Sequence, residues 1–158
     1  MKRPRTWALV ADGVRARILR GLEGGAPLPH PPGELISRSR SRHLRDVMSD
    51  RPGRTQSSDR SGRRSAMEPG SDPIRQDMRD FAHDLMDRLD SHRRAGDFER
   101  LAIFAAPAML GLLREAMPQA LRSTVILERS QNLVQSGEAE LREIVRSEIG
   151  RFPGDMSA

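Results

Sequence analysis

The hydrophobic pattern of the first forty residues is typical of β-structure. Residues 6–11 form a short apolar run, which predicts a buried strand. In residues 14–20 apolar side chains alternate with Arg15 and Arg17, and this period of two predicts a second strand whose arginine face lies in water. A third strand is predicted in residues 28–36, where three prolines restrict it to the edge of a sheet.

Asp12 and Gly13 stand between the first two strands and form the sequence signal of a tight hairpin turn. Both central residues of such a turn need a positive φ, which aspartate and glycine tolerate. We therefore expect residues 6–11 and 14–20 to pair as antiparallel neighbours.

The second half of the chain changes to a period typical of helices. Asp72 and Pro73 predict a helix start, because aspartate caps free N–H groups and proline suits the first turn. Gly96 is a predicted helix stop. The apolar positions between them share one helical face: Ile74, Met78, Phe81, Ala82, Leu85 and Leu89.

Two apolar segments, residues 101–106 and 124–127, are typical of strands buried on both faces. A helix that begins at Pro107 and is interrupted near Pro118 joins them. A last helix over residues 138–149 has four positions that we expect to be buried: Leu141, Ile144, Val145 and Ile149. This βαβ arrangement predicts adjacent parallel strands and a right-handed crossover.

Together these elements predict one α/β domain over residues 1–150. Its mixed five-stranded sheet combines an N-terminal antiparallel hairpin with the βαβ unit, and strand 6–11 lies parallel to strand 101–106. Helices are expected on both faces of the sheet. One long basic loop, residues 37–72, interrupts the domain, and residues 151–158 are a loose tail.

The basic loop carries most of the positive charge of the chain. It has five acids and nine arginines, at positions 38, 40, 42, 45, 51, 54, 60, 63 and 64. Its net charge is therefore +4, against +5 for the whole chain. Loops of this length in compact domains are mostly functional or disordered. We expect Arg51 to Arg54 to be ordered near Glu68, and residues 55–64 to be mobile because their composition is polar.

Composition narrows the function classes. An isoelectric point near 11.1 favours an acidic partner such as RNA, although Lys2 is the only lysine and codon preference explains an arginine bias equally well. Aromatic residues make up 3% of the chain, which leaves few platforms for base stacking. Cysteine is absent, which excludes thiolate chemistry. Without a run of about 20 apolar residues or an export signal, we expect a cytoplasmic protein that does not enter membranes.

Several short strings carry a resemblance to a known family. They are Val10-Ala11-Asp12-Gly13, Ala16-Arg17-Ile18, Ser49-Asp50-Arg51-Pro52-Gly53-Arg54, Ala66-Met67-Glu68-Pro69, Asp72-Pro73, Phe81-Ala82, Ala106-Pro107, Leu110-Gly111 and Leu113-Arg114. With these strings the chain resembles, over about residues 5 to 145, a bacterial family of host attachment proteins, which are described as required for attachment to host cells.

That family is similar to the middle domain of the class-one peptide-chain release factors of eukaryotes and archaea. The similarity implies a non-enzymatic module of release-factor-like fold that contacts RNA or the ribosome through its basic loop. In release factors this loop carries a Gly-Gly-Gln tip that promotes hydrolysis of peptidyl-tRNA. The comparable string here is Ser61-Gly62-Arg63-Arg64-Ser65, which has no such tip. Release activity is therefore not implied.

One candidate site lies where the parallel strands end, because open α/β sheets bind ligands at the carboxyl ends of their strands. Asp12 and the helix start at residues 106–111 belong to this edge, and the free N–H groups of the helix suit an anionic ligand. Asp12 and Glu128 could instead be carboxylates of a two-cation hydrolase. The hairpin already accounts for Asp12, so we expect neither a metal nor a cofactor nor a catalytic residue.

A second candidate site lies in the basic loop. Arg51 and Arg54 flank the turn Pro52-Gly53, where they could bind one phosphate or pair with Asp50 and Glu68. Arg63 and Arg64 suit RNA phosphates. The binding candidates are thus Asp12, Gly13, Arg51, Gly53, Arg54, Arg63, Arg64, Glu68, Pro107 and Gly111. Three functions remain open at this point: an RNA-binding module, a protein that supports attachment to a host surface, and a metal-dependent hydrolase.

Overall fold

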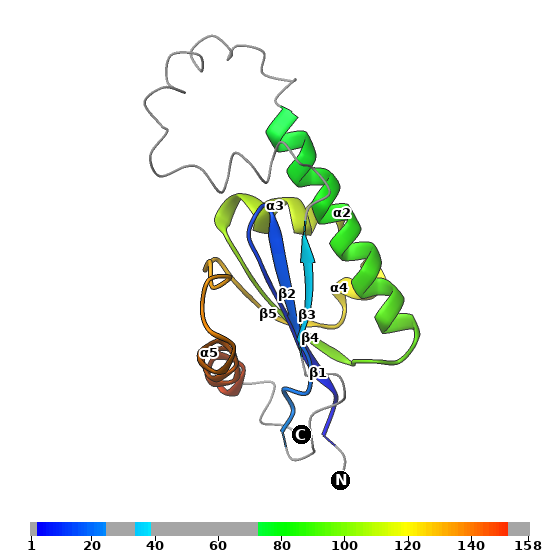
Figure 1. Ribbon diagram of the computed structural model, residues 1–158. Coiled ribbons are helices and arrows are strands. Elements are labelled where there is room, and N and C mark those ends of the chain that lie inside the picture. Colours follow the sequence, from blue (N-terminus) through cyan, green and yellow to red (C-terminus); the bar gives the residue numbers. More distant parts are fainter. Residues whose placement is uncertain (1–2, 25–33, 39–72, 152–158) are drawn as a thin grey trace.

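The structure, a computed structural model, describes residues 3–24, 34–38 and 73–151, with residues 34–38 described by their backbone alone. The elements follow one another as β1 (Thr6–Ala11), β2 (Arg15–Leu19), β3 (Glu34–Arg38), α2 (Pro73–Arg94), β4 (Arg100–Ala105), α3 (Pro107–Ala116), α4 (Gln119–Arg122), β5 (Val125–Arg129) and α5 (Glu138–Gly150) (Figure 1). The predicted α/β class is confirmed.

The strands form one mixed sheet in the order β3-β2-β1-β4-β5. β1 lies at its centre, antiparallel to β2 and parallel to β4, so Leu9 is flanked by Ile18 and Ile103. β5 continues the sheet parallel to β4. The predicted hairpin and the adjacent parallel strands of the βαβ unit are both confirmed.

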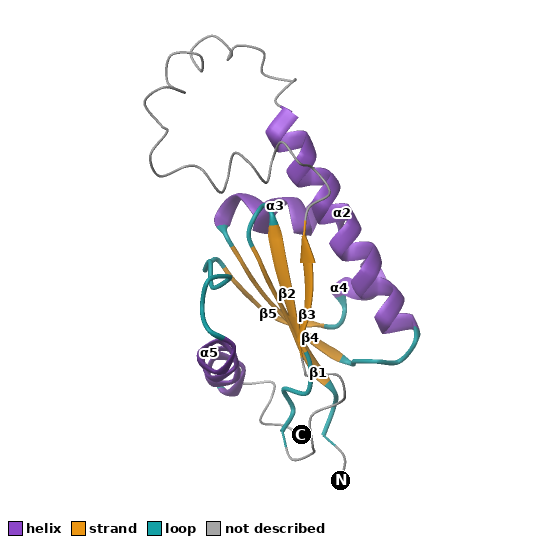
Figure 2. Cartoon of the chain, viewed as in Figure 1, coloured by secondary structure: helices purple, strands orange, loops and turns teal. Residues whose placement is uncertain are grey.

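β1 is buried along its whole length because helices cover both faces of the sheet. Trp7, Leu9 and Ala11 pack in the cluster that α2, α3 and α4 cover. Ala8 and Val10 pack in the second cluster, which α5 covers. Figure 2 shows α2 and α3 on one side of the strands and α5 on the other. An uninterrupted apolar run such as 6–11 is the pattern that such two-sided burial requires.

α2 is the long helix of the first layer. Its buried side chains are Phe81, Ala82, Leu85, Met86 and Leu89, which form one stripe against the sheet and α3. The helix ends at Arg94, and Gly96 follows with a φ of 81°, which is the left-handed stop that glycine permits. No helix within residues 73–151 is long and apolar enough to cross a membrane.

Among the described residues, α5 is the helix of the second layer. Leu141 and Val145 are fully buried, and they pack with Phe104 and Leu127 from the sheet. Ile144 was expected to be buried as well, but it is only half-buried. Its position lies at the margin of the stripe defined by Leu141 and Val145, so it faces along the sheet surface instead of into it.

The third strand differs from its predicted position. Of the five strands expected, four are described with their side chains, and β3 is Glu34–Arg38 instead of residues 28–36. β3 pairs antiparallel with β2, and Leu19 lies opposite Glu34. Ladder hydrogen bonds need backbone N–H groups, which prolines lack, so the pairing begins after the last proline. The predicted loop therefore loses residues 37 and 38 to this strand.

Candidate functional site

The carboxyl ends of β1 and β4 meet at one edge of the sheet. Ala11 lies opposite Ala105, and the Ala106 N–H donates to the Ala11 carbonyl oxygen at 3.2 Å. Asp12 therefore leaves β1 beside Pro107, the first residue of α3. The predicted neighbourhood of Asp12 and the helix start is confirmed at the level of the backbone. No side chain caps α3, because Ala106 occupies the N-cap position.

The Asp12 carboxylate is engaged in holding the hairpin. Its Oδ1 accepts hydrogen bonds from the backbone N–H groups of Val14 at 2.9 Å and Arg15 at 2.8 Å. The Asp12 N–H donates to the Arg15 carbonyl oxygen at 3.0 Å, so Gly13 and Val14 form the tip. Neither Asp12 nor Gly13 has a positive φ, and the predicted turn type is therefore wrong. The carboxylate oxygen takes the place of a backbone acceptor, which removes the need for left-handed residues.

Gly13 packs closely against α2. It is buried under α2, and a Cβ added to it would lie 3.0 Å from the Cε of Met78 and 3.2 Å from the Sδ. Real Cβ atoms seldom approach other atoms so closely. Because Gly13 lacks a side chain, α2 can pass directly over the tip of the hairpin. The contact between Gly13 and Met78 thus joins α2 to the hairpin of β1 and β2.

Glu128 does not join Asp12 in a common site. Its Oε1 accepts from the Arg114 Nε at 2.7 Å, which ties β5 to α3. Glu128 lies level with Ile103, two strands away from Asp12 and about three residues behind it along the sheet. At strand spacings of about 4.8 Å and rises of about 3.3 Å per residue, their Cα atoms are roughly 14 Å apart. The structure therefore places Glu128 against Arg114 and does not bring it into contact with Asp12.

A register shift in β5 explains the direction of Glu128. The pairing of β4 and β5 slips between Leu101 and Ala102, which leaves Ile126 as the extra residue. Such a bulge re-aims the side chains that follow it. Glu128 consequently reaches Arg114 on α3, whereas Arg129 reaches Glu148 on α5 at 3.3 Å. The consecutive residues Glu128 and Arg129 thus connect the sheet to α3 on one face and to α5 on the other.

No cluster of three or more histidine, aspartate or glutamate side chains that could hold a metal ion occurs among the described residues. His92 and Asp97 do pair, with 2.7 Å between Nδ1 and Oδ2, but this pair lies at the end of α2. The His92 ring also packs against Trp7, with ring centroids 5.0 Å apart. His83 is exposed on α2.

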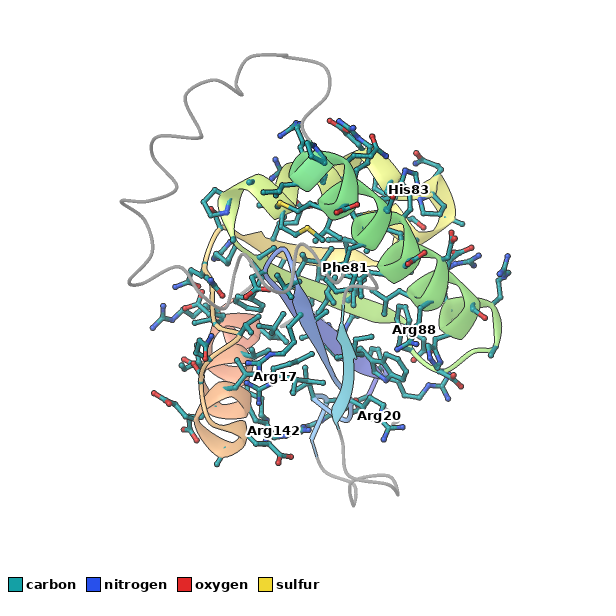
Figure 3. All side chains as sticks on the ribbon, turned by 45° about the horizontal axis from the view of Figure 1, so that its top comes forward. Arg17, Arg20, Phe81, His83, Arg88 and Arg142 are labelled. Carbon is teal, nitrogen blue, oxygen red and sulfur yellow. The ribbon has the colours of Figure 1, made fainter. Side chains whose placement is uncertain are left out.

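The arginine face of β2 is covered, and the predicted wet face is wrong. Arg17 is only 7% exposed, and its Nη1 donates to the carbonyl oxygens of Val134 and Ser136. The Arg15 Nη2 donates to the same Val134 oxygen at 2.6 Å. Figure 3 shows Arg17 on the side of the sheet that α5 covers. Alternation identifies which side chains share a face, but it carries no information about a segment 117 residues away that covers that face.

The remaining candidates divide into two groups. Pro107 and Gly111 are exposed on α3, and a Cβ at Gly111 would meet no atom within 4 Å, so close packing does not require a glycine there. The other candidates lie outside the described residues: Arg51, Gly53, Arg54, Arg63, Arg64 and Glu68. The expected packing of Arg51 and Arg54 near Glu68 lies outside them as well and stays a prediction.

Comparison with known proteins identifies one family. The model of a family described as "Protein required for attachment to host cells" matches residues 7–145, which is most of the chain. No curated protein matches the chain. The match covers β1 through most of α5 and includes the hairpin of Asp12 and the start of α3. It does not extend to release factors, and that similarity stays a prediction.

Proposed function

We propose a function from one established premise: the chain belongs to the family of proteins required for attachment to host cells. Within that family, we propose that this protein is a binding module that contacts RNA or the ribosome through its arginine-rich segment, residues 37–72. We place this activity in the cytoplasm as part of the same proposal.

The concentration of charge in this segment carries the proposal. Nine arginines and five acids lie within 36 consecutive residues, which hold +4 of the formal charge of +5. Guanidinium groups bind phosphate oxygens through paired N–H donors, and each phosphate contact releases condensed counterions. The few aromatic residues favour contacts to the RNA backbone over stacking on its bases.

The local structure at the edge of the sheet favours binding over catalysis. The Asp12 carboxylate holds the hairpin and the Glu128 carboxylate pairs with Arg114, so each already has a structural partner. The segment begins within the last two residues of β3 and ends directly before α2, and both elements are fixed to the sheet at the same end as the hairpin tip. A basic segment held between such anchors is suited to presenting positive charge.

Replacing Arg60, Arg63 and Arg64 with alanine tests this proposal. We expect RNA affinity to fall by a similar factor for unrelated sequences, because phosphate contacts carry no sequence information. The slope of log affinity against log salt should flatten by up to about one unit for each lost contact. Filter binding at several salt concentrations measures both quantities.

The matched control removes the same charge from the folded surface. Arg79, Arg88 and Arg94 lie on α2, and their joint replacement with alanine also lowers the net charge by three. If RNA affinity falls equally in both variants, the overall charge of the protein explains the loss, and the segment is rejected as the contact surface. The segment lacks a Gly-Gly-Gln tip, so we expect no hydrolysis of peptidyl-tRNA. Rapid hydrolysis by the unaltered protein would reject the proposal of a non-enzymatic binding module.

The family description favours a second function, support of bacterial attachment to a host surface. A direct role requires the intact chain outside the cell, whereas an indirect role requires only that its loss reduces attachment. Detecting the chain in the culture medium and on the cell surface separates these routes. Reduced attachment of a deletion strain that retains all of its protein inside the cell supports the indirect route.

A further inference from the structure

A cluster of arginines surrounds the turn that follows β2, at the end of the sheet opposite Asp12. The Arg3 Nη1 donates to the Glu23 carbonyl oxygen at 3.0 Å, and the Arg142 Nη1 donates to the Arg20 carbonyl oxygen at 2.8 Å. Arg146 lies one helical turn beyond Arg142 on α5. Guanidinium groups from Arg3 and from α5 thus contact backbone carbonyl groups of residues 20–24; Figure 3 labels Arg20 and Arg142.

Two of these groups approach the same point in space. A Cβ added to Gly24 would lie 2.7 Å from the Arg146 Nη2 and 3.5 Å from the Arg3 Nη1. The two nitrogens are therefore at most about 6 Å apart, a distance at which like charges repel each other. Among the described residues neither side chain pairs with a carboxylate, and the Glu23 carboxylate accepts instead from the Thr6 N–H at 2.9 Å.

Gly24 allows Arg146 to lie close against the turn. Its φ is 74°, which strains any residue with a side chain, and a side chain there would displace Arg146. Arg3 and Arg146 are both exposed, so an ion from solution can reach them. The result is two convergent donors at an accessible position, with Arg142 one helical turn away from Arg146 on α5.

We propose that Arg3 and Arg146 form a clamp for a phosphate group, with Gly24 allowing Arg146 to approach the turn closely. Charge-assisted N–H···O bonds are about 2.7–2.9 Å long, so one tetrahedral oxyanion between the two guanidinium groups reaches both. A doubly charged phosphate monoester suits the clamp better than a carboxylate, because it neutralises both cations. The clamp is independent of segment 37–72 and of the function proposed for it.

Titration of the isotope-labelled full chain with inorganic phosphate, followed by NMR, tests the clamp. At constant ionic strength, we expect saturable shifts of the amide signals of residues 21–24, and only small, unsaturated shifts with acetate or chloride. R146A should weaken phosphate binding by about tenfold or more, since it removes one of two charge-assisted contacts. R146K, which keeps the charge but loses the paired donors, should lie between R146A and the unaltered chain.

Arg88 provides the matched control. It is exposed on α2, in the layer on the other face of the sheet, and R88A should leave phosphate binding unchanged. Equal weakening by R88A and R146A, or identical shifts with acetate and phosphate, would overturn the proposal. A second titration with a 5′-phosphorylated oligoribonucleotide and its unphosphorylated form identifies the source of the phosphate. A preference for the phosphorylated end supports a clamp for RNA termini, and response to free phosphate alone supports a clamp for a small phosphate.

Discussion

The Asp12 carboxylate holds the tip of the hairpin by accepting two backbone N–H groups. An acceptor is sufficient for this task, and a negative charge is not required. A metal ligand or a general base, in contrast, depends on the ionised carboxylate. The structural and the chemical role of Asp12 can therefore be separated by one pair of substitutions.

We predict that D12A lowers the free energy of unfolding by about 1–2 kcal/mol, because both N–H groups lose their acceptor. D12N keeps an oxygen at the same position and should change stability by less than about 0.5 kcal/mol. Urea denaturation measures both values. If D12N destabilises the protein as much as D12A does, the charge of Asp12 has a role that the hairpin does not explain.

At the scale of elements, the segment between β5 and α5 is fixed to the sheet by arginines. Arg15 and Arg17 of β2 both donate to the Val134 carbonyl oxygen, and Arg17 reaches Ser136 as well. Val134 is buried against the sheet, so the segment closes the space at the start of α5. Buried guanidinium groups with carbonyl acceptors make this a polar contact within an otherwise apolar layer.

Replacing Arg17 with methionine should lower the free energy of unfolding by about 1.5–3 kcal/mol, since hydrogen bonds to a buried charged group are lost. Amide exchange should accelerate selectively at residues 133–136, ahead of α5. R122M is the control, because Arg122 is exposed and its side chain donates to the Arg114 carbonyl oxygen at the protein surface. Unaltered exchange at residues 133–136 in R17M would show that Arg15 and the packing of Val134 are sufficient to hold the segment.

The elements that the sequence predicts well are those defined by local pattern. The apolar runs of β1 and β4 require burial on two faces, and Gly96 ends α2 because its φ is left-handed. What the pattern misses depends on distant contacts. Residues 134–136 cover the arginines of β2. The bulge at Ile126, after which Glu128 reaches Arg114, arises only when β5 pairs with β4.

At the scale of the whole molecule, the two helical layers share one sheet. The clusters on its two faces use alternate side chains of the same strands, for example Leu9 and Val10 of β1. Loss of either layer would expose one face of β1 and β4 to water. The layers should therefore unfold together in spite of having no side-chain cluster in common.

Trp7 allows this cooperativity to be measured, because it is the only tryptophan and it lies in the layer of α2 and α3. Its fluorescence and the far-ultraviolet circular dichroism should change in one coincident urea transition. L141A, on the opposite face, should lower the midpoint of both signals to the same extent, with a loss of about 2–5 kcal/mol. If the circular dichroism changes at a lower urea concentration than the Trp7 fluorescence does, α5 unfolds separately.

The pairing of β1 with β4 also determines the order in which the protein can form. Thr6 and Arg100 are neighbours in the sheet but 94 positions apart in the chain, whereas β1 and β2 meet across a turn. During synthesis the hairpin can close at once, but the second edge of β1 has no partner until β4 is made. At about 5–20 residues per second, that delay lasts seconds, and distant pairings are slow to form even afterwards. An apolar central strand with an open edge is prone to association with other chains, so speed of synthesis and early protection by chaperones should govern its yield more than the stability of the finished fold.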